Sequence, residues 1–536
     1  MLMPNAQAQN SAGPGAAHFD GPQEAATFAL AGSPQPDRKD LHDLLYASLI
    51  PNGTTHPEKL NATFERVQEV TNIILDGAAG RALQSITRDA PQLLDDPRQT
   101  IGDGLAELIV QALIQNASGQ EIIQMARLFN DSEISAAEAV DLHEAFKIPV
   151  SRLEKDIIPV KAKGVWLRAV DGKTYLDMDS NYSATNLGSD NPEIARGLFN
   201  QATRLISMKE DRVHIARARF LKTFRGMLPD ELNQFYWQNS GGEAVDKSLK
   251  LAKAFTGTTG VVAFKGGFHG RTHGAVAVTH NLKYRKPFGL DKLDWVHFAE
   301  YNDAEGVKAL FAEGKAKIVI LELVQGEEAG IRPAEPSFVR SLRQTCDEHG
   351  GVLIFDEVQT GFGRVAEAPG QWFACQGYGV VPDIITIGKS FGGGYPVTAV
   401  VTKKAISQAM HPGYDGSTFG GNPMAMVAAT IATRQMRSLD LTRNVVARSA
   451  QFVQGLAALR EKFPEVGTIR SKGLMVAFEL PSAEKVAQFQ EEMAKNGVMT
   501  SLSTGPAVRL LPPLIISEQE VEFFLAAAEK SLLATA

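Results

Sequence analysis

The 536-residue sequence has little cysteine. The two cysteines, Cys346 and Cys375, form no CxxC motif and no Cys/His spacing of a metal site. We therefore expect free thiols in a reducing cytosol, with no disulfide and no metal. No apolar run approaches the roughly 18 residues that span a bilayer. The first twenty residues lack the basic segment and apolar core of a secretory signal. These absences predict a cytoplasmic protein without a membrane partner.

An excess of basic charge is also missing. The chain carries 54 Lys and Arg against 61 Asp and Glu, a net charge of −7. This balance argues against a nucleic-acid-binding protein, which needs a concentrated basic field. Hydrophobic residues make up 44% and charged residues 21%, as in globular proteins. At this length we expect two or three domains.

The first 150 residues differ from the rest in composition and in the spacing of their apolar residues. Residues 1–40 are rich in Ala, Gly, Pro, Gln and Asn without periodicity, which predicts a mobile tail. Residues 41–150 show apolar residues at helical spacing and few β-branched runs. We expect a helical extension there, with a structural or oligomeric role and no catalytic constellation of its own.

After residue 150 the pattern becomes that of an α/β protein. Residues 164–177 read as two short strands around the Asp171-Gly172 turn. We expect residues 151–205 to form the N-terminal part of a small domain, 206–435 a large domain, and 436–536 a smaller C-terminal α+β domain. In the large domain, helices at 244–255 and 336–349 alternate with strands at 260–264, 316–324, 351–355 and 384–387. Alternation at this spacing predicts a mostly parallel sheet flanked by helices.

Two of the expected strands end in charged residues. The strand at 384–387 leads into Lys389, and the strand at 351–355 leads into Asp356, about thirty residues upstream. A buried amine is costly unless it is covalently occupied, as in a Schiff base with an aldehyde cofactor. A strand-end acid can partner the pyridine nitrogen of the same cofactor. The pair therefore points to pyridoxal 5'-phosphate.

Glycine-rich turns offer weaker signals. Ser240, Gly241 and Gly242 open an expected helix, where free N–H groups and the helix dipole suit a phosphate, although an ordinary N-cap fits as well. Phe268 lies among glycines and can either lie flat on a ring or belong to the core. The loop 416–423 supplies hydroxyls for a second phosphate contact or forms a tight turn.

Six motifs in order carry a family resemblance. NSGGEAVD, FKGGFHGR, ELVQGEEAG, LIFDEVQTGFGR, PDIITIGKSFGGG and GSTFGGNP resemble the class III aminotransferases, the ornithine and acetylornithine aminotransferase family. The resemblance covers roughly residues 150–536. It implies the fold type I architecture of pyridoxal-phosphate enzymes, with a mostly parallel seven-stranded sheet, and a homodimer with shared active sites.

The resemblance also implies roles for individual residues. Lys389 would bind the cofactor aldehyde and act as general base and acid, while Asp356 would pair the pyridine nitrogen. Gln359 would bond the phenolic oxygen, and Val358 and Phe268 would cover the two ring faces. The full set implied at the cofactor is Ser240, Gly241, Gly242, Phe268, His269, Glu322, Asp356, Val358, Gln359, Lys389, Ser417 and Thr418. Thr418 would reach the phosphate from a second subunit.

On the substrate side the resemblance singles out four residues. Arg271 matches an arginine that binds a substrate carboxylate, and Tyr182 lies in a segment similar to the ornithine enzyme's pocket. Glu327 and Arg509 match an acid–arginine switch. In such a switch an ω-amine enters while Glu327 neutralises Arg509. When Glu327 swings away, Arg509 receives the carboxylate of glutamate or 2-oxoglutarate. An ordinary structural salt bridge is the alternative for this pair.

Three departures from the family pattern concern the substrate. Gly242 replaces the usual threonine, Leu323 replaces a frequent proline, and residues 188–192 lack the usual Gly-His-x-His-Pro. We expect an ω-aminotransferase that uses glutamate/2-oxoglutarate and a small-molecule amine donor or aldehyde acceptor such as ornithine, lysine, a diamine or a less common biosynthetic compound. An aminomutase, racemase or decarboxylase of the same fold, or a non-catalytic scaffold, are the alternatives.

Overall fold

The computed structural model describes residues 134–328, 330–501 and 505–535, and the chain divides into two compact units, Met1–Lys155 and Asp156–Ala536. In the first unit, α8 (Ala136–Phe146) is described, with the Ser135 hydroxyl accepting a hydrogen bond from the Glu138 amide at 3.1 Å. The predicted tail at 1–40 and the predicted extension up to residue 133 lie outside the described residues.

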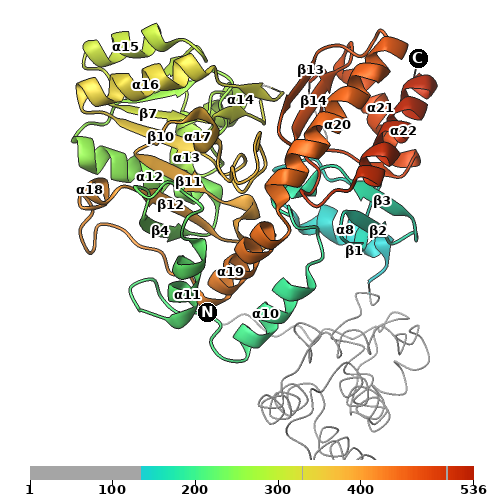
Figure 1. Cartoon of the computed structure of the whole chain (residues 1–536), viewed down its shortest axis with the longest axis horizontal. Helices are drawn as coiled ribbons and strands as arrows, with labels where there is room; N and C mark the ends of the chain where they lie inside the picture. The colour runs from blue at the N-terminus through green and yellow to red at the C-terminus, as the bar shows by residue number, and fades with distance from the viewer. Residues whose placement is uncertain (1–133, 329, 502–504, 536) are drawn as a thin grey trace, which may run out of the picture. The chain divides into compact units, whose positions relative to one another are not determined.

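The largest sheet of the second unit has seven strands and lies in the left-hand lobe of Figure 1. All its strands are parallel except β12, which runs antiparallel to both of its neighbours. This confirms the predicted mostly parallel sheet. In spatial order the strands are β4 (Gln234–Gln238), β12 (Thr398–Thr402), β11 (Ile384–Ile387), β10 (Val352–Asp356), β7 (Ile318–Leu321), β5 (Val261–Phe264) and β6 (Val296–Ala299).

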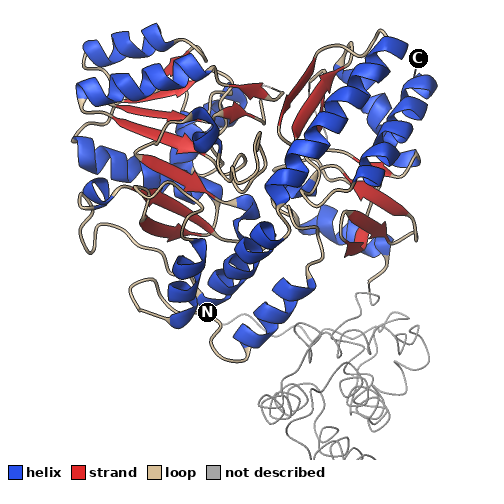
Figure 2. Ribbon diagram, viewed as in Figure 1, coloured by secondary structure: helices blue, strands red, loops and turns tan. Residues whose placement is uncertain are grey.

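Helices cover both faces of this sheet (Figure 2). Side chains alternate along each strand, so Ile354 of β10 packs into the cluster with α12 (Gly241–Thr256), and Phe355 packs into the cluster with α16 (Pro336–His349). The other helices in this part of the chain are α10 (Pro192–Ala202), α11 (Ile215–Phe224), α13 (His273–Val278), α14 (Leu282–Arg285), α15 (Ala304–Ala312), α17 (Ala374–Tyr378), α18 (Lys404–Ser407) and α19 (Pro423–Ser438).

One expected strand was wrong. The sequence predicts a single strand over 316–324, but β7 ends at Leu321 and a separate strand, β8 (Val324–Gln325), pairs with β9 (Arg332–Pro333). Glu322 is the reason for the break. Its carbonyl accepts a hydrogen bond from the Tyr301 hydroxyl at 2.8 Å, and its carboxylate accepts one from the Phe268 amide at 2.8 Å. The chain therefore leaves the large sheet at this buried acid.

Two smaller sheets join residues far apart in the sequence. The predicted 164–177 hairpin is confirmed as an antiparallel pair, and one sheet has the order β1 (Pro159–Lys163), β2 (Trp166–Ala169), β3 (Thr174–Asp177) and β15 (Val498–Met499). A three-stranded sheet contains β13 (Ile469–Lys472), β14 (Met475–Glu479) and β16 (Ala507–Leu510), near the helices α20 (Leu441–Lys462), α21 (Ala483–Lys495) and α22 (Glu518–Thr535). The domain limits drawn from the sequence stay predictions.

Within the described ranges, every helix is too short or too polar to cross a membrane. The same residues contain no cluster of three or more His, Cys, Asp and Glu side chains that could hold a metal ion.

Candidate active site

A cavity of about 570 Å³ lies where β10 and β11 end. In open α/β sheets ligands bind beyond the carboxyl ends of the parallel strands, and both charged strand-end residues line this cavity. The sequence-predicted residues that line it are Ser240, Gly241, Gly242, Phe268, His269, Arg271, Glu322, Glu327, Asp356, Val358, Gln359 and Lys389. The other four predicted residues, Tyr182, Ser417, Thr418 and Arg509, do not line it.

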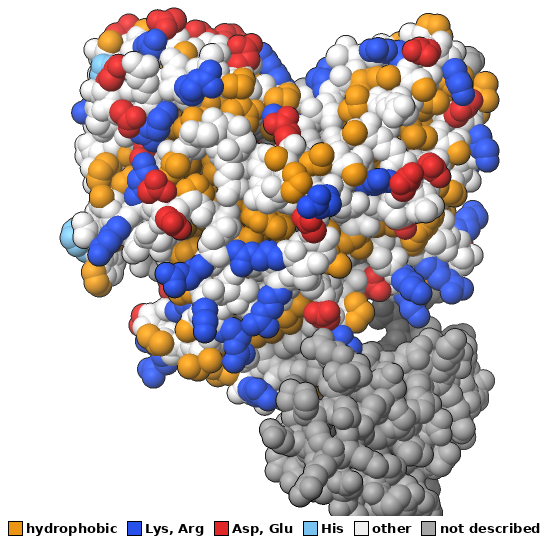
Figure 3. All heavy atoms as spheres, in the orientation of Figure 1, with side chains coloured by type: hydrophobic (Ala, Val, Ile, Leu, Met, Phe, Trp, Pro, Cys, Tyr) orange, Lys and Arg blue, Asp and Glu red, His pale blue; other side chains and the backbone are white. Residues whose placement is uncertain are grey.

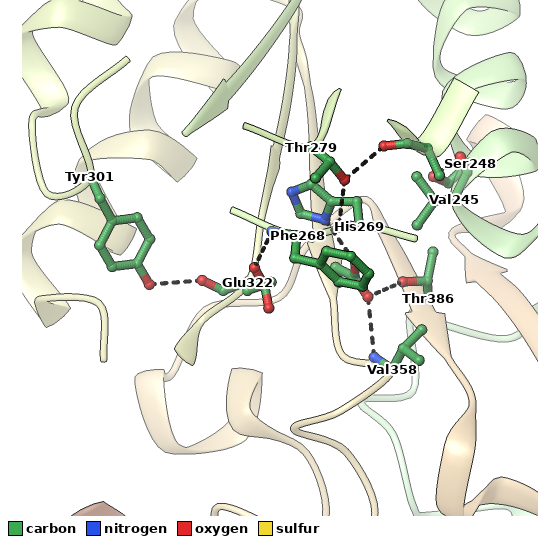
Figure 4. Close-up of polar contacts among 11 residues, drawn as sticks. Val245, Ser248, Phe268, His269, Thr279, Tyr301, Glu322, Val358 and Thr386 are labelled. Carbon is green, nitrogen blue, oxygen red and sulfur yellow. Dashed lines mark hydrogen bonds and ion pairs between the residues drawn. The ribbon is translucent and has the colours of Figure 1, made fainter. Parts of the chain in front are cut away.

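Asp356 ends β10 with its carboxylate held by three donors (Figure 4). One oxygen accepts a hydrogen bond from His269 Nδ1 at 2.8 Å. The other accepts from the Thr386 hydroxyl at 2.9 Å and from the Val358 amide at 3.2 Å. Thr386 lies directly opposite Asp356 on β11. The carboxylate is therefore fixed in one orientation at the wall of the cavity.

His269 and Glu322 complete a buried charged cluster around Asp356. Burial opposes the charged imidazolium, but the hydrogen bond and charge of Asp356, together with the charge of Glu322, raise the pKa of His269 above its usual value. Burial, reinforced by Asp356 and opposed by His269, raises the pKa of Glu322 to about 7. The cluster thus places behind Asp356 a histidine whose charged form is favoured by its neighbours, and an acid whose pKa lies near neutrality.

Lys389 begins a short 3-10 helix, Lys389–Gly392, after β11. Its φ of 48° lies in the left-handed region, which non-glycine residues rarely adopt. Burial lowers the pKa of its amine to about 8, with Arg509 lowering it further and Glu327 opposing the shift. This amine therefore loses its proton more readily than an ordinary lysine, as a nucleophile or a general base requires.

The N-terminus of α12 forms a narrow cup at another part of the cavity wall. Ser240 caps the helix by accepting a hydrogen bond from the Glu243 amide at 3.3 Å, and the first helical amides have no intrahelical partner. A Cβ at Gly242 would lie 2.9 Å from the Thr272 hydroxyl. Gly270, at φ 125°, would place a Cβ 2.7 Å from Gly242 Cα. At Gly270 a side chain would meet backbone, whereas a Cβ at Gly242 would require the Thr272 side chain to shift. The resulting cup exposes backbone N–H groups to an anion.

Arg271 lies exposed at the cavity wall, on two aromatic rings. Its guanidinium carbon is 4.0 Å from the centroid of Tyr284 and 5.1 Å from that of Phe268. The structure shows no ion pair to Arg271 among the residues it describes. A cation held by stacking can still offer its donors to a carboxylate. Gln359 also lines the cavity, and its side-chain amide donates a hydrogen bond to the Tyr182 carbonyl at 3.4 Å.

Glu327 and Arg509 form an ion pair with 2.5 Å between Oε2 and Nη1. Arg509 is buried on β16 opposite Ala477, whereas the Glu327 side chain is about a quarter exposed and lines the cavity. Burial would raise the pKa of Glu327, but the charge and hydrogen bond of Arg509 prevail and lower it. Arg509 therefore lies behind Glu327, 5.6 Å from the Tyr182 ring centroid.

Ser417 and Thr418 lie elsewhere in the chain, against a second cavity of about 770 Å³. The Ser417 amide donates to a Glu210 carboxylate oxygen at 3.1 Å, and Thr418 is exposed. Within one chain neither residue lines the cavity that contains the α12 cup.

Sequence reasoning missed two residues that the structure shows to be important. Thr386 is the one polar side chain inside the apolar strand β11, and that isolated hydroxyl was an available signal. Arg364 is completely buried and donates to four acceptors. No local pattern marks it, because arginines in loops are ordinarily exposed.

Comparison with protein families agrees with this geometry. The family model for aminotransferase class-III matches residues 149–532. The acetylornithine aminotransferase of Archaeoglobus fulgidus is 36% identical over 369 residues, covering 68% of this chain and 93% of that protein. The [LysW]-aminoadipate semialdehyde transaminase of Deinococcus radiodurans is 35% identical over 380 residues, covering 70% and 86%.

Solved structures show the same fold. The ornithine aminotransferase of Toxoplasma gondii superposes with a TM-score of 0.70 at 24% identity, covering 77% of this chain and 98% of that one. The acetylornithine aminotransferase of Elizabethkingia anophelis gives a TM-score of 0.64 at 26% identity, covering 74% and 99%. Another structure of the Toxoplasma gondii enzyme has pyridoxal phosphate partially occupying its active site.

Proposed function

The chain belongs to the class III aminotransferases, which use pyridoxal 5'-phosphate, and from this premise we propose that it is an ω-aminotransferase with glutamate and 2-oxoglutarate as one substrate pair. The observation that carries the proposal is the single cavity that Lys389, Asp356 and Glu327 line together, with Arg509 bonded behind Glu327.

The residues of the cavity fit the cofactor. The α12 cup would hold the phosphate, Asp356 would face the pyridine nitrogen, and Phe268 and Val358 would lie on the two sides of the ring. When bound, the cofactor supplies an aldehyde for amines and a ring that accepts electrons from the reacting carbon.

The chain's own groups would do the proton chemistry. The Lys389 amine would remove the proton from the carbon that bears the substrate amine, and would return a proton at the end of the half-reaction. Asp356 would hold the proton on the ring nitrogen, because His269 and Thr386 fix its carboxylate in place. Arg271 would bind a substrate carboxylate where it stacks on Phe268 and Tyr284.

The acid–arginine pair would choose between the two substrates. While Glu327 is paired with Arg509, the two charges cancel, and this end of the cavity suits a cationic ω-amine donor. Displacement of Glu327 would expose Arg509 to the second carboxylate of 2-oxoglutarate. Because relatives act on acetylornithine and on [LysW]-aminoadipate semialdehyde, a donor with an ornithine- or lysine-like chain is the first to test.

We also propose a homodimer in which Thr418 of one subunit reaches the phosphate cup of the other. Thr418 is exposed and does not line the cavity that holds the cup of its own chain. Val213 is 90% and Ile215 73% exposed, a degree of apolar exposure that favours burial against another chain. Figure 3 shows Lys and Arg side chains gathered among apolar ones over the region of α11 and α19. A cytoplasmic location stays a prediction.

The test is a donor screen with purified, cofactor-loaded protein. Ornithine, lysine, acetylornithine and simple diamines would each be offered with 2-oxoglutarate, and glutamate formation measured. We expect turnover with at least one of these ω-amines, and its complete absence would contradict the proposal. Release of carbon dioxide, or product formed without any keto acid, would favour a decarboxylase, racemase or aminomutase instead.

A further inference from the structure

A left-handed turn lies beside the active site. Ser180, Asn181, Tyr182 and Ser183 have φ values of 45°, 50°, 56° and 74° in succession, and none of them is glycine. Left-handed backbone is unfavourable for L-residues, so four in a row persist only where surrounding contacts determine the conformation. Backbone strain of this kind concentrates where a geometry serves a function.

Three hydrogen bonds hold the turn at its ends. The Ser180 amide donates to the Asp177 carboxylate at 2.8 Å, and the Ser180 hydroxyl donates to the Leu511 carbonyl at 2.6 Å. At the other end the Ser390 hydroxyl donates to the Ser183 carbonyl at 2.6 Å. Ser390 directly follows Lys389, and Leu511 lies two residues after Arg509. The turn is therefore bonded to both segments that carry the charged groups of the site.

The buried Arg364 side chain also holds the left-handed turn in place. Its guanidinium is completely buried and donates to the Ser180 hydroxyl at 3.3 Å and to the Pro512 carbonyl at 2.6 Å. It also donates to the Leu474 carbonyl at 3.1 Å and to the Asn186 side chain. Pro512 and Leu474 adjoin the strands β16 and β14, whereas Arg364 follows β10 of the large sheet. One buried cation thus joins the large sheet, the turn and the strand of Arg509.

We propose that Ser180 and Arg364 are positioning residues for substrate binding, which lock the left-handed turn against the end of β16 and so set the Tyr182 ring against the Arg509 guanidinium. This inference rests on the proposed function, because it concerns the end of the cavity that would receive a dicarboxylate. Ser180 takes no part in the hydrogen bonds that fix Asp356 or in the contacts that shape the α12 cup. Both of these lie at the cofactor end of the cavity.

The geometry predicts the main effect at the substrate end of the site. Without the Ser180 hydroxyl the Leu511 carbonyl loses its donor, and Arg364 loses one acceptor. The turn is then free to relax toward ordinary backbone, and the Tyr182 ring leaves its place 5.6 Å from Arg509. A dicarboxylate that bridges this end should bind more weakly, while the cofactor is held as before.

Ser180→Ala is the test, and Ser183→Ala is its matched control. Both changes remove a buried hydroxyl from the same turn. The Ser183 hydroxyl, however, has no hydrogen-bond partner among the described residues. The probe is glutarate, an unreactive dicarboxylate, titrated into each cofactor-loaded protein and followed by its thermal stabilisation. We expect glutarate to bind Ser180→Ala about tenfold more weakly than wild type, and Ser183→Ala to match wild type.

Two further readouts separate positioning from loss of fold. The dissociation constant of the cofactor should be unchanged in Ser180→Ala, and KM for 2-oxoglutarate should rise about tenfold with little change in kcat. Equal glutarate affinities for wild type and Ser180→Ala would overturn the proposal, and so would weakened cofactor binding. If wild type binds glutarate but transfers no amino group, the proposed function fails while this inference is still decided by the binding data.

Arg364→Lys gives a second, independent variant. Lysine keeps the buried charge but cannot reach four acceptors at once, since its ammonium is a compact point charge. Where the variant folds, as judged by circular dichroism, glutarate binding should weaken at least as much as in Ser180→Ala. Wild-type glutarate affinity in folded Arg364→Lys would count against the proposal.

Discussion

The cofactor end and the substrate end of the cavity are built in different ways. At the cofactor end, Asp356 ends β10 and Lys389 begins the 3-10 helix that follows the adjacent parallel strand β11, and Asp356 lies opposite Thr386 in register. At the substrate end, Glu327 and Arg509 are 182 residues apart, and Arg509 comes from a different sheet. The first arrangement follows from sheet pairing, whereas the second depends on how separate sheets pack together.

This difference indicates where the protein can vary its chemistry. Groups on neighbouring strands cannot move without breaking the sheet, which suits a proton transfer that needs fixed geometry. The Glu327 side chain is partly exposed and lies in the segment between β8 and β9, so it can swing while Arg509 stays buried. Changes at the cofactor end should therefore abolish turnover, and changes at the substrate end should alter selectivity.

The largest effect is expected from Lys389→Ala. Removing the amine deletes the general base of both half-reactions and should lower kcat by about 10³-fold. Steady-state glutamate formation measures this, with circular dichroism as the control for folding. Turnover within tenfold of wild type would show that the strand-end lysine is not the base. A cellular function that persists in the variant after turnover is lost would favour the scaffold alternative.

Asp356→Asn should have the next largest effect. The change keeps the shape of the side chain but removes the charge that would face the ring nitrogen, at a cost of about 3 kcal/mol, or on the order of 10²-fold in kcat. The matched control is Glu357→Gln. This neighbouring carboxyl does not line the cavity and accepts hydrogen bonds from the Ala374 and Cys375 amides at 2.6 and 2.8 Å. Similar losses of turnover in both variants would contradict the assignment.

The buried amine should also make stability depend on pH. In the apoprotein burial lowers the pKa of Lys389 to about 8 from the 10.5 of an unperturbed lysine. Between these values the unfolded chain binds more protons, so the free energy of unfolding should rise from pH 8 to 10.5, and the penalty should be complete below pH 8. Solvent in the open cavity reduces the full difference of about 3 kcal/mol to about 2 kcal/mol.

Lys389→Met removes this titration and is the reference. Urea unfolding of both apoproteins at pH 8 and pH 10.5 measures the effect as the difference between their pH dependences. Parallel curves for the two apoproteins would show that the amine is not desolvated.

Glu327→Gln should produce the smallest change, and its main effect should be at the substrate end. Without the carboxylate, Arg509 is no longer neutralised, so KM for a cationic ω-amine donor should rise about tenfold while KM for 2-oxoglutarate stays the same or falls. Glu328→Gln is the control, because Glu328 bonds Asn281 at 2.7 Å and not Arg509. Equal effects on donor and acceptor would identify the ion pair as structural.

The parallel sheet could be predicted because several of its strands are short apolar runs with β-branched residues, and a run such as Ile384–Ile387 indicates a strand by itself. The expected strand at 316–324 was wrong, since Glu322 looks like a strand residue until its partners Tyr301 and Phe268 are placed beside it. The ring-side roles of Phe268 and Val358 came from family resemblance, because an isolated apolar residue carries no such signal.

By itself the sequence determined the alternation of strands and helices and the two strand-end charges, because both are properties of short continuous segments. Only the tertiary structure decided the left-handed backbone of residues 180–183, the burial of Arg364 and the pairing of Glu327 with Arg509. Each of these costs free energy locally, through strain, desolvation or charge burial, and is stable only because residues distant in sequence supply the compensating hydrogen bonds.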